Sequence, residues 1–273
     1  MKKQRGISLI EILISMVLGL SLMAGIGQLF IQSQKSFSTQ RNLSDMTDDG
    51  SIALELLGKG FLQAGFAENG NFTGSDGVSF QAEATPFSDT TLSFNTGEYI
   101  KGTDSEIIYR YRISMNNSSD PRMNGDPSNF ICTDTDVFKN ALVGEMLTVH
   151  IYLKNDDNGI PFLRCSVKTA SIQAPTDEEQ QKLISEVYKL IIRYGVRETG
   201  GLYYADKANM DLNADNWKKV VALKVFLVMR SADDNLTRNH VIYSIEGVAQ
   251  PAVPDKRLYK VFSKTVYLRA PDH

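Results

Sequence analysis

The stretch ISLIEILISMVLGLSLMAGIGQLFI, residues 7–31, decides the fold of this chain, and it follows a short basic leader, MKKQRG, residues 1–6. A bilayer's hydrocarbon core takes about 20 residues of α-helix to cross, so this apolar run is long enough to span it. Its only charged residue is Glu11. A carboxylate at the middle of a helix in lipid costs roughly 2.5–3.5 kcal/mol on insertion scales, and somewhat less near the end. The sequence therefore predicts a membrane helix whose glutamate needs a cationic partner.

Three interpretations of this segment compete. A secretory signal peptide would have a short apolar core and a small-residue cleavage site, for which Leu22-Met23-Ala24 is a candidate. A plain signal anchor would account for the length and the basic flank. Neither interpretation explains Glu11. A third places the cut between Gly6 and Ile7 and keeps the helix in the mature protein.

Residues 3–11, KQRGISLIE, resemble the prepilin signal of type IV pilins and type II secretion pseudopilins. In that family a peptidase cuts after the glycine and methylates the new N-terminus, and a glutamate is the fifth residue of the mature chain. The resemblance implies cleavage between Gly6 and Ile7, N-methylation of Ile7, and an assembly role for Glu11. The chain departs from the family's most common residue, phenylalanine, at Ile7, which makes the methylation less certain.

Helical spacing continues beyond the apolar run. Apolar and small residues recur every three or four positions on one face, namely Leu43, Met46, Gly50, Ala53, Leu57, Phe61 and Ala64. Gly65 is a suitable stop, and Asp48–Gly50 is the weakest point, where a kink is conceivable. We therefore predict one helix over about 7–64. The predicted organisation is a leader (1–6), a transmembrane half (7–31), an amphipathic half (32–66) and a globular head (67–273).

Within the transmembrane half, Ser15 and Gly19 follow Glu11 at intervals of four residues and share its face. Small residues on such a stripe allow another helix to approach closely, so we predict a helix-packing surface here. Ordinary small residues facing lipid are the alternative.

The remainder of the chain predicts an α+β fold, in which the long helix packs on a mainly antiparallel β head. Runs of β-forming residues and alternating apolar residues mark the strands. The turn 155–159 joins two of them into a hairpin. The predicted strands are 91–94 (weak), 106–113, 146–153, 160–165, 187–196 (ambiguous), 220–230, 241–245 and 258–268; segments 66–90 and 115–129 are predicted loops, and 176–186 helix or loop.

The chain contains two cysteines, Cys132 and Cys165, both outside the membrane segment. In a chain exported across a membrane, such a pair indicates one disulfide, and two buried free thiols are the alternative. Two cysteines and three scattered histidines do not supply a tetrahedral zinc site.

Little in the sequence points to catalysis or to a cofactor. Its histidines, His150, His240 and His273, belong to no recognisable catalytic motif, so we expect no enzyme activity. Net charge is −3 and no dense basic tract occurs, so nucleic acid is not an expected partner. A weak calcium candidate is Asp211, Asn213 and Asp215, which are spaced like the start of an EF-hand loop. That pattern fails at its twelfth position, Ala222, and a surface turn is the alternative.

Further islands of sequence are similar to the PilW family of type IV pilus minor pilins. They are residues 51–57, 64–66, 152–164, 191–196, 217–231 and 255–269, with weak similarity over 66–130. The resemblance implies a minor pilin in a tip or priming complex that initiates pilus assembly. It implies an inner-membrane helix with a periplasmic head before assembly, and a place at the pilus tip on the cell surface afterwards.

The implied partners are other minor pilins (the V, X and FimU types), the major pilin, a tip adhesin of the PilY1 type and the prepilin peptidase. Two alternatives remain open. One is a type II secretion minor pseudopilin of the J type, a more distant relative. The other is an inner-membrane-anchored periplasmic binding domain with no polymer role.

Overall fold

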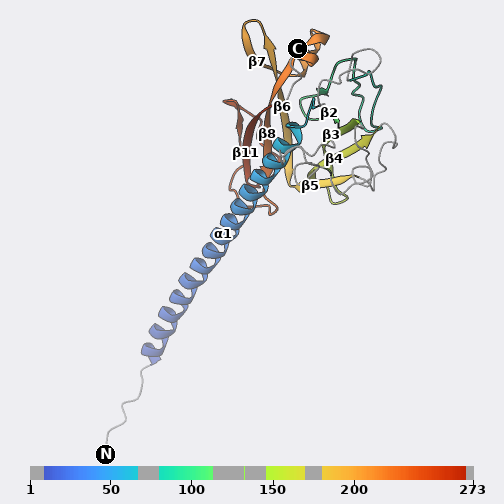
Figure 1. The fold of residues 1–273 in the computed structure, drawn as a ribbon. Coiled ribbons are helices and arrows are strands. Elements are labelled where there is room, and N and C mark those ends of the chain that lie inside the picture. Colours follow the sequence, from blue (N-terminus) through green and yellow to red (C-terminus); the bar gives the residue numbers. More distant parts are fainter. Residues whose placement is uncertain (1–8, 67–79, 113–131, 133–145, 170–179, 269–273) are drawn as a thin grey trace, which may run out of the picture.

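The computed structural model describes residues 9–66, 80–112, 132, 146–169 and 180–268. A single long helix, α1 (Leu9–Phe61), projects from a β-rich head whose described residues form two large antiparallel sheets and one small two-stranded sheet (Figure 1). At about 1.5 Å per residue the helix is roughly 80 Å long. This arrangement confirms the predicted fold class. The predicted leader, 1–6, lies outside the described residues.

The helix ends at Phe61, three residues before the predicted end at about 64, and the turn that follows it closes at the predicted stop, Gly65. Leu62–Gly65 form a turn after Phe61, and Gly65 adopts a φ of 78°, which favours glycine. Its amide donates to the carbonyl of Arg110. The helix runs without a break through Asp48–Gly50, so the kink considered there does not form.

A five-stranded sheet of order β1-β2-β3-β4-β5 forms one part of the head. Asp156 shapes the β3–β4 hairpin turn, since its Oδ1 accepts from the backbone amides of Asn158 and Ile160. The predicted strands at 106–113, 146–153 and 160–165 are thereby confirmed within the described residues. The strands are β1 (Ile100–Gly102), β2 (Ile107–Arg112), β3 (Met146–Asn155), β4 (Pro161–Thr169) and β5 (Gln181–Ser185).

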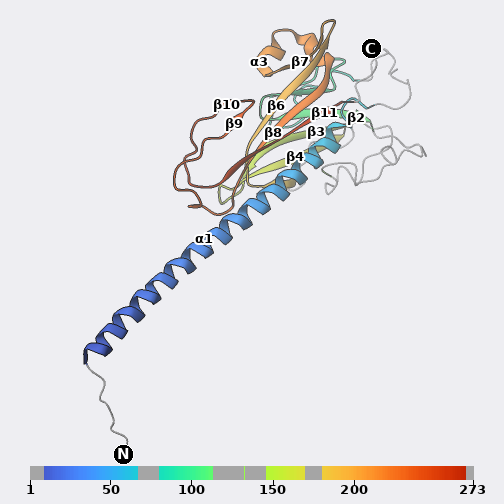
Figure 2. The same ribbon diagram turned by 90° about the vertical axis from the view of Figure 1, so that its left-hand side faces the viewer.

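A four-stranded sheet of order β11-β8-β6-β7 packs against the C-terminal half of α1 (Figure 2). The chain enters it from the first sheet through Glu186, which has a φ of 59° and is the residue between β5 and β6. The elements of this part are β6 (Val187–Glu198), β7 (Gly201–Ala205), α3 (Lys207–Asp211), η3 (Ala214–Lys219), β8 (Val220–Arg230), β9 (Ser244–Ile245), β10 (Val248–Ala249) and β11 (Tyr259–Tyr267).

The structure corrects four sequence predictions. Segment 176–186, predicted as helix or loop, contains β5 in its described part. The predicted strand 241–245 is reduced to Ser244–Ile245, and 91–94 forms only an isolated bridge between Phe94 and Glu83. Leu43, expected on the buried face of the helix, is 46% exposed, and Asn42 is buried instead.

One main core lies between α1 and the two sheets. It contains Ala53, Leu57 and Phe61 of α1 together with apolar side chains from both sheets. A disulfide joins Cys132 to Cys165 of β4, so the predicted pairing is present.

Candidate assembly surface

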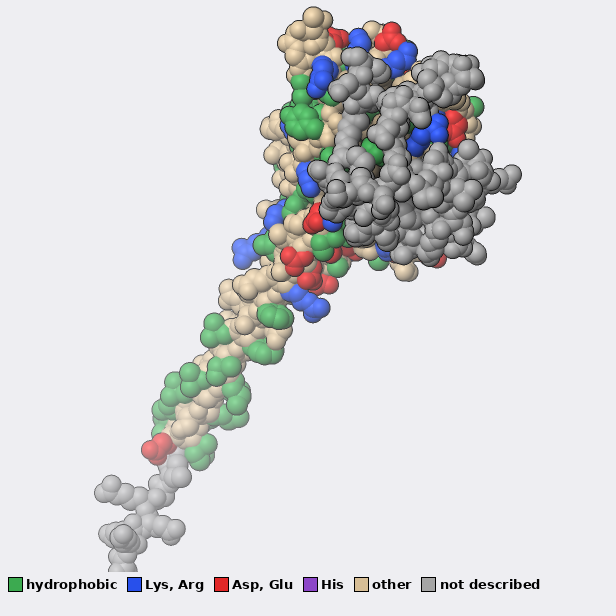
Figure 3. Space-filling model, viewed as in Figure 1, with side chains coloured by type: hydrophobic (Ala, Val, Ile, Leu, Met, Phe, Trp, Pro, Cys, Tyr) green, Lys and Arg blue, Asp and Glu red, His purple; other side chains and the backbone are tan. Residues whose placement is uncertain are grey.

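The first part of α1, Leu9–Ile31, stands away from the head and exposes its apolar side chains. Its large hydrophobic residues are between 53% and 76% exposed. Figure 3 shows these side chains along the surface of the projecting helix. The helix is long and apolar enough to cross a membrane, and none of its most apolar window is buried. This half of α1, hereafter the membrane half, therefore offers its whole circumference to lipid or to other helices.

Glu11, Ser15 and Gly19 share one face of the membrane half. The Ser15 hydroxyl donates to the carbonyl of Glu11 at 2.8 Å, so its polar group is satisfied inside the helix. A Cβ built on Gly19 would meet nothing within 4 Å. The face therefore combines a carboxylate with an open, shallow surface that a second helix can contact closely.

Glu11 lies in the first turn of α1, where the helix dipole favours a negative charge. The residues predicted for cleavage and methylation, Gly6 and Ile7, lie outside the described residues.

The second part of α1, Asn42–Phe61, hereafter the head half, is fixed against the four-stranded sheet. Gly50 allows β11 to approach the helix, because a Cβ there would lie 2.6 Å from the Phe262 ring. A Cβ on Gly58 would lie 2.8 Å from the Lys264 Nζ, the end of a flexible side chain that can move aside. Because any side chain at Gly50 would overlap the ring, this glycine sets the distance between helix and strand.

Polar contacts fix the head half to the chain that follows β8. Asp233 Oδ2 accepts from the Asn42 amide at 2.9 Å and from the Ser38 hydroxyl at 3.2 Å. These two hydrogen bonds lower the pKa of the Asp233 carboxyl. Lys260 Nζ also lies 3.0 Å from Thr47 Oγ1. Sequence reasoning identified neither Asn42 nor Asp233, because they are 191 positions apart and belong to no motif.

The calcium candidates have other partners. Asp211 accepts from the Trp217 indole at 3.2 Å and pairs with Lys207. Asn213 caps η3 by accepting from the amide of Asp215. Asp215 itself lies 2.9 Å from Lys218 Nζ. The three side chains therefore serve as a helix cap and as ion-pair or hydrogen-bond partners in this structure. The calcium site stays a prediction.

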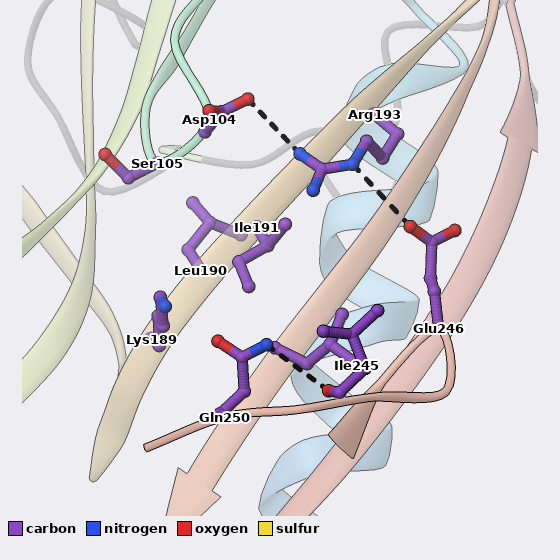
Figure 4. Close-up of a pocket in the computed structure, with 10 residues that line it drawn as sticks. Asp104, Ser105, Lys189, Leu190, Ile191, Arg193, Ile245, Glu246 and Gln250 are labelled. Carbon is purple, nitrogen blue, oxygen red and sulfur yellow. Dashed lines mark hydrogen bonds and ion pairs between the residues drawn. The ribbon is translucent and has the colours of Figure 1, made fainter. Parts of the chain in front are cut away.

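A groove of about 480 Å³ lies between β6, the turn before β2, and the β9–β10 hairpin (Figure 4). Arg193 crosses one end of it, with its Nη1 3.2 Å from Asp104 Oδ1 and its Nε 3.6 Å from Glu246 Oε2. Glu246 also accepts from Lys224 at 2.8 Å. These ion pairs hold the hairpin and the turn to the sheet, and we assign no ligand to the groove.

Comparison with known proteins adds two family matches. The family described as type IV pilus-assembly protein W matches residues 150–270. The prokaryotic N-terminal methylation motif matches residues 1–27. Among solved structures, the chain is similar to a type IV-like pilin from Thermus thermophilus, with 10% identity and a TM-score of 0.41 over 82% of this chain and 97% of that one. No curated relative matches the chain.

Proposed function

We propose that this chain, a type IV pilus minor pilin of the PilW family, helps to start or cap a pilus as part of a tip complex. The observation that carries the proposal is the membrane half of α1, which presents Glu11 on an open helical face. Such a surface suits packing into a bundle of similar helices.

In the proposed mechanism, the prepilin peptidase cuts after Gly6 and exposes the amine of Ile7. An α-amino group has an ordinary pKa of about 7.7–8.0, and methylation keeps the nitrogen basic. The mature N-terminus therefore provides a cation at the membrane end of the helix.

Glu11 of one subunit then pairs with the N-terminal amine of its neighbour inside the bilayer. Each charge alone is costly in lipid, and the two charges are tolerated better as a pair than apart. The pairing therefore favours a subunit that enters in register. Ser15 and Gly19 lie on the same face and permit the close helix contact that the ion pair requires.

The large head supports a place at the tip, because a bulky, irregular domain is harder to repeat around a tightly packed filament. We propose a structural, non-enzymatic role in which helices pack at the centre and heads face outward. Other minor pilins, the major pilin and a PilY1-type adhesin would be its neighbours. The helix would sit in the inner membrane, with the head in the periplasm, until assembly.

Replacement of Glu11 by alanine tests the pairing. We expect Glu11→Ala to abolish or sharply reduce surface pili while the leader is still removed. Glu55→Ala is the matched control, since Glu55 is an exposed glutamate of the same helix that pairs with Lys59 one turn further along. Unchanged piliation in Glu11→Ala, or an equal loss in Glu55→Ala, would contradict the mechanism.

N-terminal sequencing of the mature protein tests the processing step. The expected first residue is Ile7, and Gly6→Ala should leave a chain that keeps its leader. Any other start refutes the predicted cleavage. A deletion strain that keeps its pili but fails to export folded enzymes would instead favour the type II secretion role.

A further inference from the structure

Residues 80–94, hereafter the strap, lie across the face of the five-stranded sheet that points away from the main core. The strap contributes Phe87, Leu92 and Phe94 to a small separate core, in which they pack on Ile108 of β2. The neighbouring β2 residues, Ile107 and Tyr109, belong to the main core on the other face. The strap is therefore the cover of this second face.

Glu83 attaches the strap to the sheet through two ion pairs. Its Oε1 lies 2.9 Å from Lys168 Nζ, and its Oε2 lies 3.9 Å from Arg110 Nη1. Arg110 and Lys168 flank Thr148 in one row across β2, β3 and β4, and Thr148 also donates to Glu83. Glutamate, arginine and lysine keep their charges near neutral pH, so this contact does not change there.

A second contact holds the strap near Asp89, and its partner is a histidine. His150 of β3 is fully buried, and its Nε2 forms a hydrogen bond with Glu106 Oε2 at 3.0 Å. Its Nδ1 lies 3.4 Å from Asp89 Oδ1, which is an ion-pair distance without hydrogen-bond geometry. Its ring stacks on that of Tyr152 at 4.3 Å. Among the described residues, Asp89 of the strap, Glu106 before β2 and Tyr152 are the titratable groups that face the ring, and Arg164 of β4 lies beside Tyr152.

The protonation state decides how many of these contacts the imidazole can make. A protonated ring has two N–H donors, one for each carboxylate, whereas a neutral ring has only one. Loss of the proton therefore leaves one carboxylate facing an unprotonated nitrogen. Because the ring is buried, that arrangement is unfavourable, and the exposed residues of the strap around Asp89 are the part that can move.

We propose that His150 is a proton-operated lock, which joins Asp89 and Glu106 when protonated and releases the part of the strap around Asp89 when neutral. The ion pairs of Glu83 and the backbone bridge between Glu83 and Phe94 keep the two ends of the strap attached in both states. Movement of the part around Asp89 would uncover Ile108 and the apolar face beneath Phe87.

The electrostatics agree with this assignment. Burial alone lowers the pKa of His150, but Asp89 and Glu106 together outweigh it and raise the pKa above 6.5. Its stabilising contribution is therefore full below pH 6.5 and is lost as the pH rises through the higher, folded-state pKa. For Asp89, burial raises the pKa, but the neighbouring His150 and Tyr152 outweigh it and hold the pKa at about 2. The contribution of Asp89 is full above pH 3.8 and is lost as the pH falls through about 2, so both contributions are full between pH 3.8 and 6.5.

Hydrogen exchange of the full chain in detergent micelles tests the lock. After correction for intrinsic rates, protection of strap amides near Asp89 should fall between pH 5.5 and pH 8.5. The protection factor should fall by up to about tenfold for each pKa unit that separates His150 in the closed strap from His150 in the open strap, where the pKa is lower. His150→Gln should abolish this pH dependence. Glu83→Gln, the matched control, should lower protection near residue 83 equally at both pH values.

Titration of ¹⁵N-labelled histidine side chains in the same sample gives an independent readout. The chain has three histidines, and His150→Gln identifies the signal of the buried one. Its midpoint should lie above 6.5 and should fall in Asp89→Asn, a variant that removes a partly exposed carboxylate and keeps the fold. The proposal is overturned by a midpoint at or below 6.5, by equal strap protection at both pH values, or by pH dependence that survives in His150→Gln or Asp89→Asn.

Discussion

The two halves of α1 contain similar apolar side chains in opposite surroundings. Leu13 in the membrane half is 53% exposed, whereas Leu57 in the head half is 1% exposed. Both residues are leucines in one continuous helix, so helix propensity does not distinguish them. The difference lies in what surrounds the helix: a sheet covers one half, and the other is left for lipid and neighbouring subunits. A substitution should therefore affect folding in one half and assembly in the other.

The largest expected effect on folding comes from the head half. Leu57→Ala removes a fully packed side chain and should lower the free energy of unfolding by about 2–5 kcal/mol. Leu13→Ala removes an exposed one and should leave the stability of the head unchanged. Denaturant unfolding of the full chain in micelles, followed by fluorescence of the single buried tryptophan, Trp217, measures both. Equal destabilisation by the two variants would remove the distinction.

A smaller effect is expected where the helix approaches β11. Gly50→Leu places a side chain where the Phe262 ring lies, and such overpacking should destabilise the head by about 1–3 kcal/mol. Gly19→Leu fills open space and should leave stability unchanged, but it should reduce piliation because the packing face becomes bulky. Normal pili in Gly19→Leu would show that this face makes no close helix contact.

The smallest effect concerns the polar link between helix and head. Hydrogen bonds from Asn42 and Ser38 lower the pKa of Asp233, so its stabilising contribution is present above pH 3.8 and is lost as the pH falls through the lower, folded-state value. Asp233→Asn should flatten that part of the acid unfolding profile. Asn42→Ala should have the same effect, and the double variant should add little. Fully additive effects would mean that the two residues do not act together.

Several features of the molecule are predictable from short stretches of sequence. The long helix follows from its apolar and amphipathic spacing, and its end follows from Gly65. Strands β3 and β8 follow from alternating or continuous apolar residues, and the hairpin turn at Asp156–Gly159 from its turn-forming composition. Glu11 was recognisable because a carboxylate is foreign to an apolar run. In each of these cases, the signal is contained in neighbouring residues.

The failures have a common physical cause. β5 is a polar edge strand whose side chains are mostly half-buried, so it has no alternating apolar pattern to detect. Leu43 fits the helical stripe yet is 46% exposed, whereas the polar Asn42 beside it is buried through its contact with Asp233. The strap is loop-like in sequence and becomes ordered only through partners on β2, β3 and β4.

The sequence alone determined the long helix, the longer strands such as β3 and β8, and which residue of the membrane half carries a charge. These properties depend on periodicity and on the cost of a charge in lipid, both of which act over a few neighbouring residues. Only the tertiary structure decided that Phe262 lies against Gly50, that Asp233 binds Asn42, and that His150 lies between two carboxylates. Those contacts join residues far apart in the chain, so their energies exist only once the sheets have packed.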